Sequence, residues 1–145
     1  MKLYLLRHGE AQDSRTADFL RPLTRHGREQ AANRAEQLVH EGITPGVIIH
    51  SPRVRAVETA SFLMERFPDV PTVELTEVID ADRALFDIIR ASSFIDPIIV
   101  GHNPTLSELA SSLAGSRIHF STCSFASFEV DNYPPVKATL SRFYR

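Results

Sequence analysis

Three short apolar runs, far apart in the chain, each stop at a group of polar residues. The runs are Leu3–Leu6, Val47–Ile49 and Ile98–Val100. Unbroken runs of this length and branched composition are typical of strands that are buried on both faces, as in a parallel sheet. Ligands of open α/β proteins bind at the carboxyl ends of such strands. The residues directly after the three runs are therefore the strongest candidates for function.

Segments with helical periodicity separate the first runs. We expect one helix with Thr24 as its N-cap and its end at Gly42, and a second with Ser51 as N-cap and Pro52 as its first residue. A strand over 47–50 lies between them. The predicted inward faces are Ala31, Ala35, Leu38 and Val39 in the first helix and Ala56, Ala60, Leu63 and Phe67 in the second.

The rest of the chain continues the alternation. The expected elements are a strand near 72–75, a helix containing Leu85, Ile88 and Ile89, a strand over 97–100, and a helix that starts at Asn103-Pro104. Residues 120–143 predict two strands around a turn at 131–135, forming a hairpin at the sheet edge. This order of elements predicts one domain over 1–145, a three-layer α/β/α sandwich with a mostly parallel central sheet.

Composition and charge exclude several classes of partner. The 145 residues carry a net charge of −2, so the chain has no broad attraction for nucleic acid or for an anionic membrane surface. No run approaches the roughly 18 apolar residues of a membrane span. Cys123 is the single cysteine, which excludes an internal disulfide framework and favours a cytoplasmic protein. We expect a cytoplasmic monomer that binds neither nucleic acid nor membranes.

The residues after the three runs are suited to phosphate chemistry. Arg7 and Arg55 carry planar guanidinium groups that bind phosphate oxygens in pairs, and Gly9, without a side chain, lets the backbone approach a phosphate closely. The neutral imidazole of His8 is a nucleophile that needs no deprotonation. His102 is expected to donate a hydrogen bond to the phosphoryl group in transfer. Together these residues predict a phosphoryl-transfer site.

The motifs around these residues resemble those of the histidine phosphatase superfamily, which includes the cofactor-dependent phosphoglycerate mutases. The resemblance covers nearly the whole chain and implies a phosphoglycerate mutase-like fold. The short chain is most similar to the SixA-type phosphohistidine phosphatases. The motifs that carry the resemblance are Arg7-His8-Gly9, Leu23-Thr24-x-x-Gly27, Ser51-Pro52-x-x-Arg55-Ala56-x-x-Thr59-Ala60 and Gly101-His102, with Leu6–Ala11 and Arg21–Thr24 for the SixA type.

This resemblance assigns roles by position. The first histidine of the family is phosphorylated during turnover, which implies that role for His8. The second histidine and two arginines line the phosphate pocket, and these correspond to His102, Arg7 and Arg55. The resemblance also implies a hydrolase without a cofactor, acting on phosphohistidine in a protein such as a phosphotransfer domain.

The chain departs from the mutase-type members in ways that bear on the substrate. Ser14 stands where those members carry asparagine, and the long insertion that usually covers their site is missing. Those members also place a glutamate general acid after the helix of the Arg55-type residue. Among the acidic residues after that helix we rank Glu77 first. The full set is Glu74, Glu77, Asp80 and Asp82.

These departures favour a phosphohistidine protein over a small sugar phosphate. The P–N bond is labile and its nitrogen is protonated more readily than an alkoxide, so a missing acid matters less. An uncovered pocket also admits a side chain from another protein. Two alternatives stay open: a small-molecule phosphomonoesterase of the same superfamily, and a non-catalytic phosphate-binding module on the same fold.

Four residues in or near the motifs have expected positions or contacts but no assigned role in the reaction. Arg21 and Arg53 are expected near the pocket mouth, either steering an anionic substrate or serving as plain surface charges. Glu58 stands three residues after Arg55, a spacing that predicts an ion pair on the helix surface. His50 is expected to cap the helix that follows it.

Other phosphatase chemistries do not fit the chain. A cysteine phosphatase needs Cys-x5-Arg, but Glu129 stands six residues after Cys123, which is better explained as a core residue of a late strand. Asp80-Ala81-Asp82 follows no strong first strand, and the residues after it, Arg83-Ala84, do not fit the motif of an aspartyl-phosphate enzyme. The sequence contains neither a Gly-x-x-x-x-Gly-Lys loop nor a His-Glu-x-x-His pair. We therefore expect catalysis without a metal.

Overall fold

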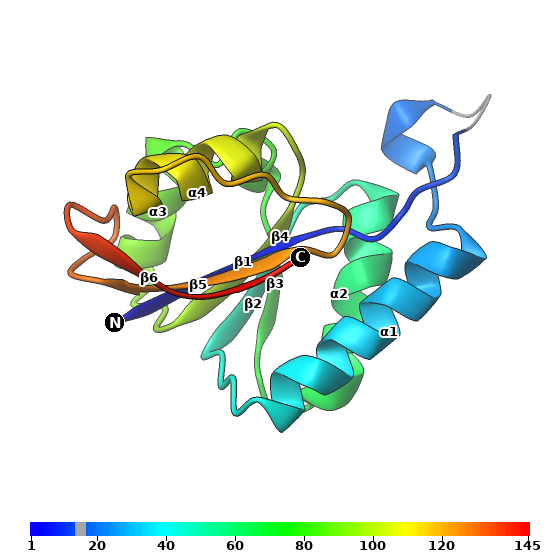
Figure 1. Cartoon of the computed structure of the whole chain (residues 1–145), viewed down its shortest axis with the longest axis horizontal. Coiled ribbons are helices and arrows are strands. Elements are labelled where there is room, and N and C mark those ends of the chain that lie inside the picture. The colour runs from blue at the N-terminus through cyan, green and yellow to red at the C-terminus, as the bar shows by residue number, and fades with distance from the viewer. Residues whose placement is uncertain (14–16) are drawn as a thin grey trace.

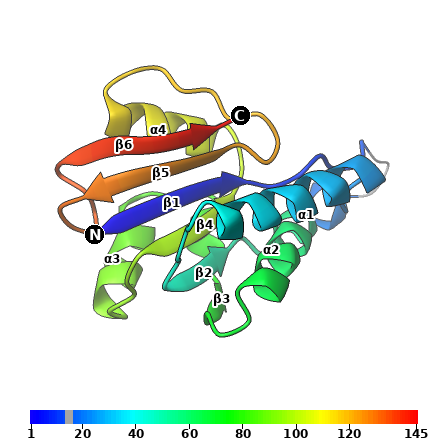
Figure 2. The same cartoon turned by 60° about the horizontal axis from the view of Figure 1, so that its bottom comes forward.

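The computed structural model of the chain describes residues 1–13 and 17–145 (Figure 1). Its centre is a six-stranded sheet in the order β3-β2-β4-β1-β5-β6, which Figure 2 shows face on. The first four strands run parallel, whereas β5 pairs antiparallel with β1 and β6 pairs antiparallel with β5. The strands are β1 (Lys2–Arg7), β2 (Val47–His50), β3 (Thr72–Glu74), β4 (Pro97–Gly101), β5 (Phe125–Val130) and β6 (Ala138–Tyr144).

Two helices cover each face of this sheet (Figure 1). Successive strand residues point to opposite faces, so Leu3 and Leu5 pack with α3 and α4, whereas Tyr4 and Leu6 pack with α1 and α2. The three-layer sandwich and the edge hairpin predicted from the sequence are therefore confirmed. The helices are α1 (Arg25–His40), α2 (Val54–Arg66), α3 (Arg83–Ala91) and α4 (Thr105–Ala114), with short 3-10 helices η1 (Asp18–Leu20) and η2 (Thr76–Val78).

The carboxyl ends of the parallel strands meet at one edge. Arg7 at the end of β1 is in register with Gly101 at the end of β4, and His50 at the end of β2 is in register with Val100. Residues that directly follow these strands, among them His8 and His102, are therefore neighbours in space although they are far apart in the sequence.

The helix starts differ in detail from the predictions. Thr24 is the N-cap of α1, as expected, and its side chain accepts a hydrogen bond from the Gly27 amide. The N-cap of α2 is Arg53, so the prediction of Ser51 as N-cap is wrong. The Ser51 amide instead donates to the Val100 carbonyl, which keeps this residue beside β4.

The structure also differs from the predictions at the inward face of α1 and at the start of α4. Val39 is 44% exposed, because its neighbour Leu38 takes the buried position against the sheet. The N-cap position of α4 is Pro104, and the Asn103 side chain accepts hydrogen bonds from the Ser107 amide and hydroxyl. Within the described residues, no helix is both long and apolar enough to cross a bilayer.

Candidate active site

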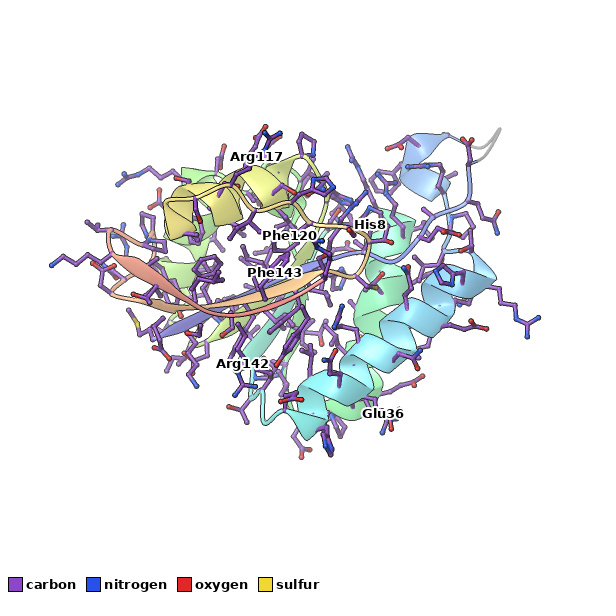
Figure 3. All side chains as sticks on the ribbon, viewed as in Figure 1. His8, Glu36, Arg117, Phe120, Arg142 and Phe143 are labelled. Atoms are coloured by element: carbon purple, nitrogen blue, oxygen red, sulfur yellow. The ribbon has the colours of Figure 1, made fainter. Side chains whose placement is uncertain are left out.

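The edge where the parallel strands end brings two buried histidines together. The rings of His8 and His102 have centroids 5.2 Å apart and are tilted by 54°. The His8 amide also donates to the Gly101 carbonyl at 3.1 Å, which ties the end of β1 to the end of β4. Figure 3 shows His8 at the carboxyl end of β1, with the first turns of α2 alongside.

His8 is held in a form suited to nucleophilic attack. Its Nδ1 lies 2.6 Å from the Gly9 carbonyl oxygen, and since that oxygen is only an acceptor, Nδ1 carries the proton and Nε2 keeps a lone pair. Burial, together with the nearby cations Arg55 and Arg7, lowers the pKa of His8 to about 4. The ring is therefore neutral at neutral pH, with Nε2 available for attack on phosphorus.

His102 offers a hydrogen-bonding group to the same region. Its Nε2 lies 2.7 Å from the Ser51 hydroxyl oxygen. Its Nδ1 is buried and has no partner within residues 1–13 and 17–145. Burial, together with the proximity of His8 and Arg55, lowers the pKa of His102 to about 3. This ring is therefore also neutral at neutral pH.

The two predicted arginines are anchored at one edge of their guanidinium groups. One terminal nitrogen of Arg7 donates to the Phe120 carbonyl at 3.0 Å. Arg55 donates to the Asp18 carbonyl at 2.8 Å and to its carboxylate at 3.3 Å. Burial lowers the pKa of both arginines, but an arginine stays charged in a protein. The Nε atoms of both are buried without a partner among the described residues.

Three buried nitrogens beside His8 thus have no hydrogen-bond partner in the described part of the chain: Arg7 Nε, Arg55 Nε and His102 Nδ1. Buried donors are almost always paired in folded proteins. Two fixed cations and a second neutral imidazole next to a nucleophilic imidazole suit a transferring phosphoryl group. The sequence-predicted set of Arg7, His8, Arg55 and His102 therefore comes together at one place.

Asp18 was not identified from the sequence, although it contacts three arginines. Its carboxylate accepts from Arg55, lies 3.2 Å from Arg21 Nε and lies 3.8 Å from Arg53. Arg21 and Arg53 therefore lie close to Arg55 around the same carboxylate, and their side chains are 27% and 28% exposed. No periodic pattern in residues 10–22 singled out Asp18, and the prediction made at Ser14 lies outside the described residues.

Gly9 connects the loop after β1 to α2. Its amide donates to Thr59 Oγ1 at 3.0 Å, and the Thr59 hydroxyl donates to the Arg55 carbonyl at 2.8 Å. The Gly9 amide is therefore engaged within the protein, and its backbone packs closely against that of Gly27. The structure gives the missing side chain at Gly9 a packing reason that the sequence did not suggest.

Two weaker predictions are wrong. Glu58 binds the Leu23 amide at 2.9 Å and Arg28 at 2.6 Å, and it does not pair with Arg55, which is turned toward Asp18. His50 does not cap α2, because its Nδ1 donates to the Ser51 carbonyl.

Glu77, the residue ranked first as general acid, lies in η2. This short helix follows β3, so it stands at the same edge of the sheet as the histidines, and its Val78 packs against Gly101. The Glu77 carboxylate is partly buried and forms no ion pair or hydrogen bond with the described residues. Its position is compatible with the predicted role.

Among the described residues, this edge of the sheet offers neither a thiolate nucleophile nor a cluster of metal ligands. Burial raises the pKa of the Cys123 thiol to about 12, so it is not a thiolate nucleophile. Cys123 is a core residue as predicted, but it lies in a turn before β5 rather than in a strand, and its amide donates to the His8 carbonyl. Within the described residues, no group of three His, Cys, Asp or Glu side chains is arranged to hold a metal.

The sequence is similar to those of several known proteins. Residues 3–83 match the family model of the histidine phosphatase superfamily, branch 1. A 5''-phosphoribostamycin phosphatase from Niallia circulans is 36% identical over 109 residues, covering 70% of this chain and 47% of that protein. The chain thus spans about half the length of this relative, and between 22% and 64% of the other curated relatives.

Two solved structures match almost the whole chain. A protein assigned as the phosphohistidine phosphatase SixA of Agrobacterium tumefaciens has a TM-score of 0.85 and 22% identity, covering 99% of this chain and 97% of that chain. The protein histidine phosphatase SixA in complex with tungstate has a TM-score of 0.84 and 23% identity, covering 99% and 96%. These structures establish the common fold. Because the family match includes Arg7, His8 and Arg55 and extends over more than half of the sequence, the chain belongs to the histidine phosphatase superfamily, branch 1.

Proposed function

We propose that this chain is a phosphatase that takes a phosphoryl group onto His8 and releases it to water, with phosphohistidine in a protein as its substrate. The observation that carries the proposal is the set of three buried, unpartnered nitrogens, on Arg7, Arg55 and His102, beside a neutral His8. All four side chains come from one chain, so we propose that it acts as a monomer.

The first step transfers the phosphoryl group to the enzyme. The Nε2 lone pair of His8 attacks phosphorus, and the bond from phosphorus to the imidazole nitrogen of the substrate breaks. The electron pair of that bond stays on the substrate nitrogen, which takes up a proton. Arg7 Nε, Arg55 Nε and His102 Nδ1 donate to the oxygens on which charge is spread during transfer.

The second step returns the enzyme to its starting state. A water oxygen attacks the phosphorus of phosphorylated His8, and the bond between phosphorus and Nε2 breaks. The electron pair returns to Nε2, and orthophosphate leaves with the oxygen of the water. Neither step uses a metal or a redox partner, and both use the same donors around the phosphoryl group.

The rim of the site favours a protein as the phosphoryl donor. Phe19 and Leu20 of η1 are 46% and 54% exposed, directly after Asp18, which contacts Arg55. Exposed apolar side chains beside a cluster of arginines suit contact with a protein surface around a phosphorylated residue. The SixA proteins of the same fold, named as phosphohistidine or protein histidine phosphatases, support this choice.

A small-molecule phosphomonoesterase is the second candidate. It is favoured by the 36% identity to the 5''-phosphoribostamycin phosphatase, whose name describes a small phosphorylated substrate. The chemistry at His8 is the same in both cases, and the two candidates differ in what surrounds the phosphoryl group.

Turnover of two substrate classes by the same preparation tests the proposal. A histidine-containing phosphotransfer domain, labelled with ³²P by phosphoramidate chemistry, is compared with a panel of sugar phosphates and nucleotides. We expect the highest kcat/KM on the phosphoprotein, and an acid-labile, alkali-stable label on the enzyme that His8→Asn abolishes. His40→Asn, at an exposed histidine, is the matched control.

The outcomes separate the candidates. Efficient hydrolysis of a small ester and none of the phosphoprotein supports the phosphomonoesterase and rejects the protein substrate. Full activity of His8→Asn on both classes rejects the histidine mechanism itself. Binding of orthophosphate without turnover of any substrate leaves a phosphate-binding module.

A further inference from the structure

Ser51 lies fully buried between β2 and α2, against the ring of His102. Its relative exposure is 0%, and its amide donates to the Val100 carbonyl at 3.2 Å, which fixes the residue beside β4. The hydroxyl oxygen lies 2.7 Å from His102 Nε2. The residue is therefore held where its side chain contacts one ring nitrogen of His102 and leaves the other free.

The other hydrogen bonds of the Ser51 hydroxyl indicate which group donates in its contact with His102 Nε2. The oxygen already accepts the amide proton of Arg53, at 3.2 Å. Its own proton has one acceptor within reach among the described residues, the lone pair of His102 Nε2. If Nε2 carried the proton instead, the buried hydroxyl proton would be left without an acceptor, which folded proteins avoid.

We infer that Ser51 is a positioning residue: its hydroxyl donates to Nε2 of His102 and thereby keeps the single proton of the neutral ring on Nδ1. Nδ1 is the buried, unpartnered nitrogen, so the ring presents a donor to the phosphoryl group without having to be charged. An imidazole held in the other tautomer would present a lone pair to the oxyanion and repel it.

The two histidines then share one tautomer but serve opposite roles. His8 Nδ1 is engaged with the Gly9 carbonyl, which leaves the Nε2 lone pair for attack. His102 Nε2 is engaged with Ser51, which leaves the Nδ1 proton for donation. The backbone carbonyl and the serine hydroxyl, one an acceptor and the other a donor, make the two rings different.

The tautomer of His102 can be read by long-range ¹H–¹⁵N correlation NMR at pH 7 on ¹⁵N-labelled protein, with inorganic phosphate as the probe. His102→Asn identifies the signals. We expect a protonated Nδ1 and an unprotonated Nε2 in the native protein, with and without phosphate. Ser51→Ala is expected to remove this preference and shift both nitrogen signals toward the other tautomer.

Ser124→Ala is the matched control, because Ser124 is also 0% exposed and its hydroxyl has no partner among the described residues. It removes an equally buried hydroxyl and should leave the His102 signals unchanged. A native protein with the proton on Nε2, or a Ser51→Ala variant with native His102 signals, overturns the inference. The first of these is measured on the native protein, so the test does not depend on how Ser51→Ala folds.

The consequence for catalysis rests on the proposed function. With p-nitrophenyl phosphate, we expect Ser51→Ala to lower kcat by about 10- to 100-fold, as when the partner that orients a histidine is removed, and Ser124→Ala to change it by less than about twofold. A shifted tautomer with native kcat would reject the positioning role. If the native protein hydrolyses neither a phosphate ester nor the phosphoprotein, the proposed function fails, whereas the NMR result still decides how Ser51 and His102 are paired.

Discussion

The backbones of Gly9 and Gly27 cross so closely that a Cβ atom on Gly9 would lie 2.6 Å from the Gly27 carbonyl oxygen. The contact on the other side is tighter still, since a Cβ on Gly27 would overlap the carbonyl oxygen of Glu10, the residue after Gly9. The first turn of α1 is thereby pressed against the loop that carries His8. Two glycines that belong to separate motifs are thus required where the first turn of α1 meets the loop after β1.

Gly27→Ala tests this contact, because the clash and the helix propensity predict opposite changes in the free energy of unfolding. Alanine in a helix is worth about 1 kcal/mol more than glycine, so helix propensity alone predicts a more stable protein. The clash predicts instead a loss of about 2 kcal/mol, as when a tightly packed region is overfilled, together with reduced phosphatase activity because the His8 loop moves. Urea unfolding measures the stability.

Asn33→Ala, at an exposed position of α1, is the control for helix propensity. It should stabilise the protein slightly, by about 0.5 kcal/mol. A Gly27→Ala variant that gains stability as this control does would show that the crossing of the two backbones is not tight.

We expect Asp18 to compete with phosphate for the arginines of the site. Its carboxylate contacts Arg55, Arg21 and Arg53 and is 59% exposed, so it neutralises cations that a phosphate dianion would otherwise attract. We expect Asp18→Asn to lower the inhibition constant of orthophosphate by about fivefold, corresponding to about 1 kcal/mol of repulsion removed at a partly exposed site. The difference should shrink at high salt.

Asp69→Asn makes the same change of net charge at an exposed position between α2 and β3, and it should leave the inhibition constant unchanged. Weaker phosphate binding by Asp18→Asn would give Asp18 the opposite role, that of holding Arg55 in place for the anion.

The layers of the fold could be predicted from the sequence because strands that are buried on both faces are written as unbroken apolar runs. Leu3–Leu6 and Ile98–Val100 are buried on both faces, and each is followed by its site residue. Helix starts were less predictable. Ser51 has the residue type of an N-cap, but its hydroxyl is engaged with His102 and the Arg53 amide, and no local pattern reveals a partner 51 residues away.

The same reasoning explains which site residues were found. Arg7, His8, Arg55 and His102 each stand in a motif directly after or near a strand end. Asp18 has no such motif, because its role arises only when η1 packs against α2. Helical periodicity placed Val39 inside with Leu38, yet two adjacent residues of α1 could not both point at the sheet.

Cys123 should be dispensable for chemistry. The high pKa of its buried thiol and its contact with the His8 loop through the backbone amide alone predict a structural role. We expect Cys123→Ala to retain native kcat on p-nitrophenyl phosphate, with a loss of stability of about 1 kcal/mol from the missing sulfur. Iodoacetamide should not inactivate the native protein, and rapid inactivation would contradict the histidine mechanism.

The general-acid role of Glu77 can be tested by comparing substrates with different leaving groups. A general acid matters most for an alkoxide and least for p-nitrophenolate, which departs without a proton. We expect Glu77→Gln to lower kcat on β-glycerophosphate by about 100-fold or more while changing turnover of p-nitrophenyl phosphate by about twofold. Glu74→Gln, on the neighbouring strand β3, is the control. Equal losses on both esters would remove Glu77 as the acid.

Burial of neutral His8 makes the stability of the protein depend on pH. The pKa of this ring is about 4 in the folded protein against 6.5 in the unfolded chain, so between these values the unfolded chain binds a proton that the folded protein does not. Stability therefore falls as pH is lowered through this window, by up to about 1.4 kcal/mol per pH unit for one group. His102 acts in the same direction.

His8→Gln removes this contribution, because glutamine does not titrate. Its free energy of unfolding in urea should fall less between pH 7 and pH 4.5 than that of the native protein, by about 2 kcal/mol. The comparison uses the difference between the two pH values, so a uniform loss of stability from the substitution cancels. His40→Gln, at an exposed histidine, should keep the native dependence. An unchanged pH dependence in His8→Gln would mean that His8 is not buried as a neutral ring, and with it the nucleophile described above would lose its physical basis.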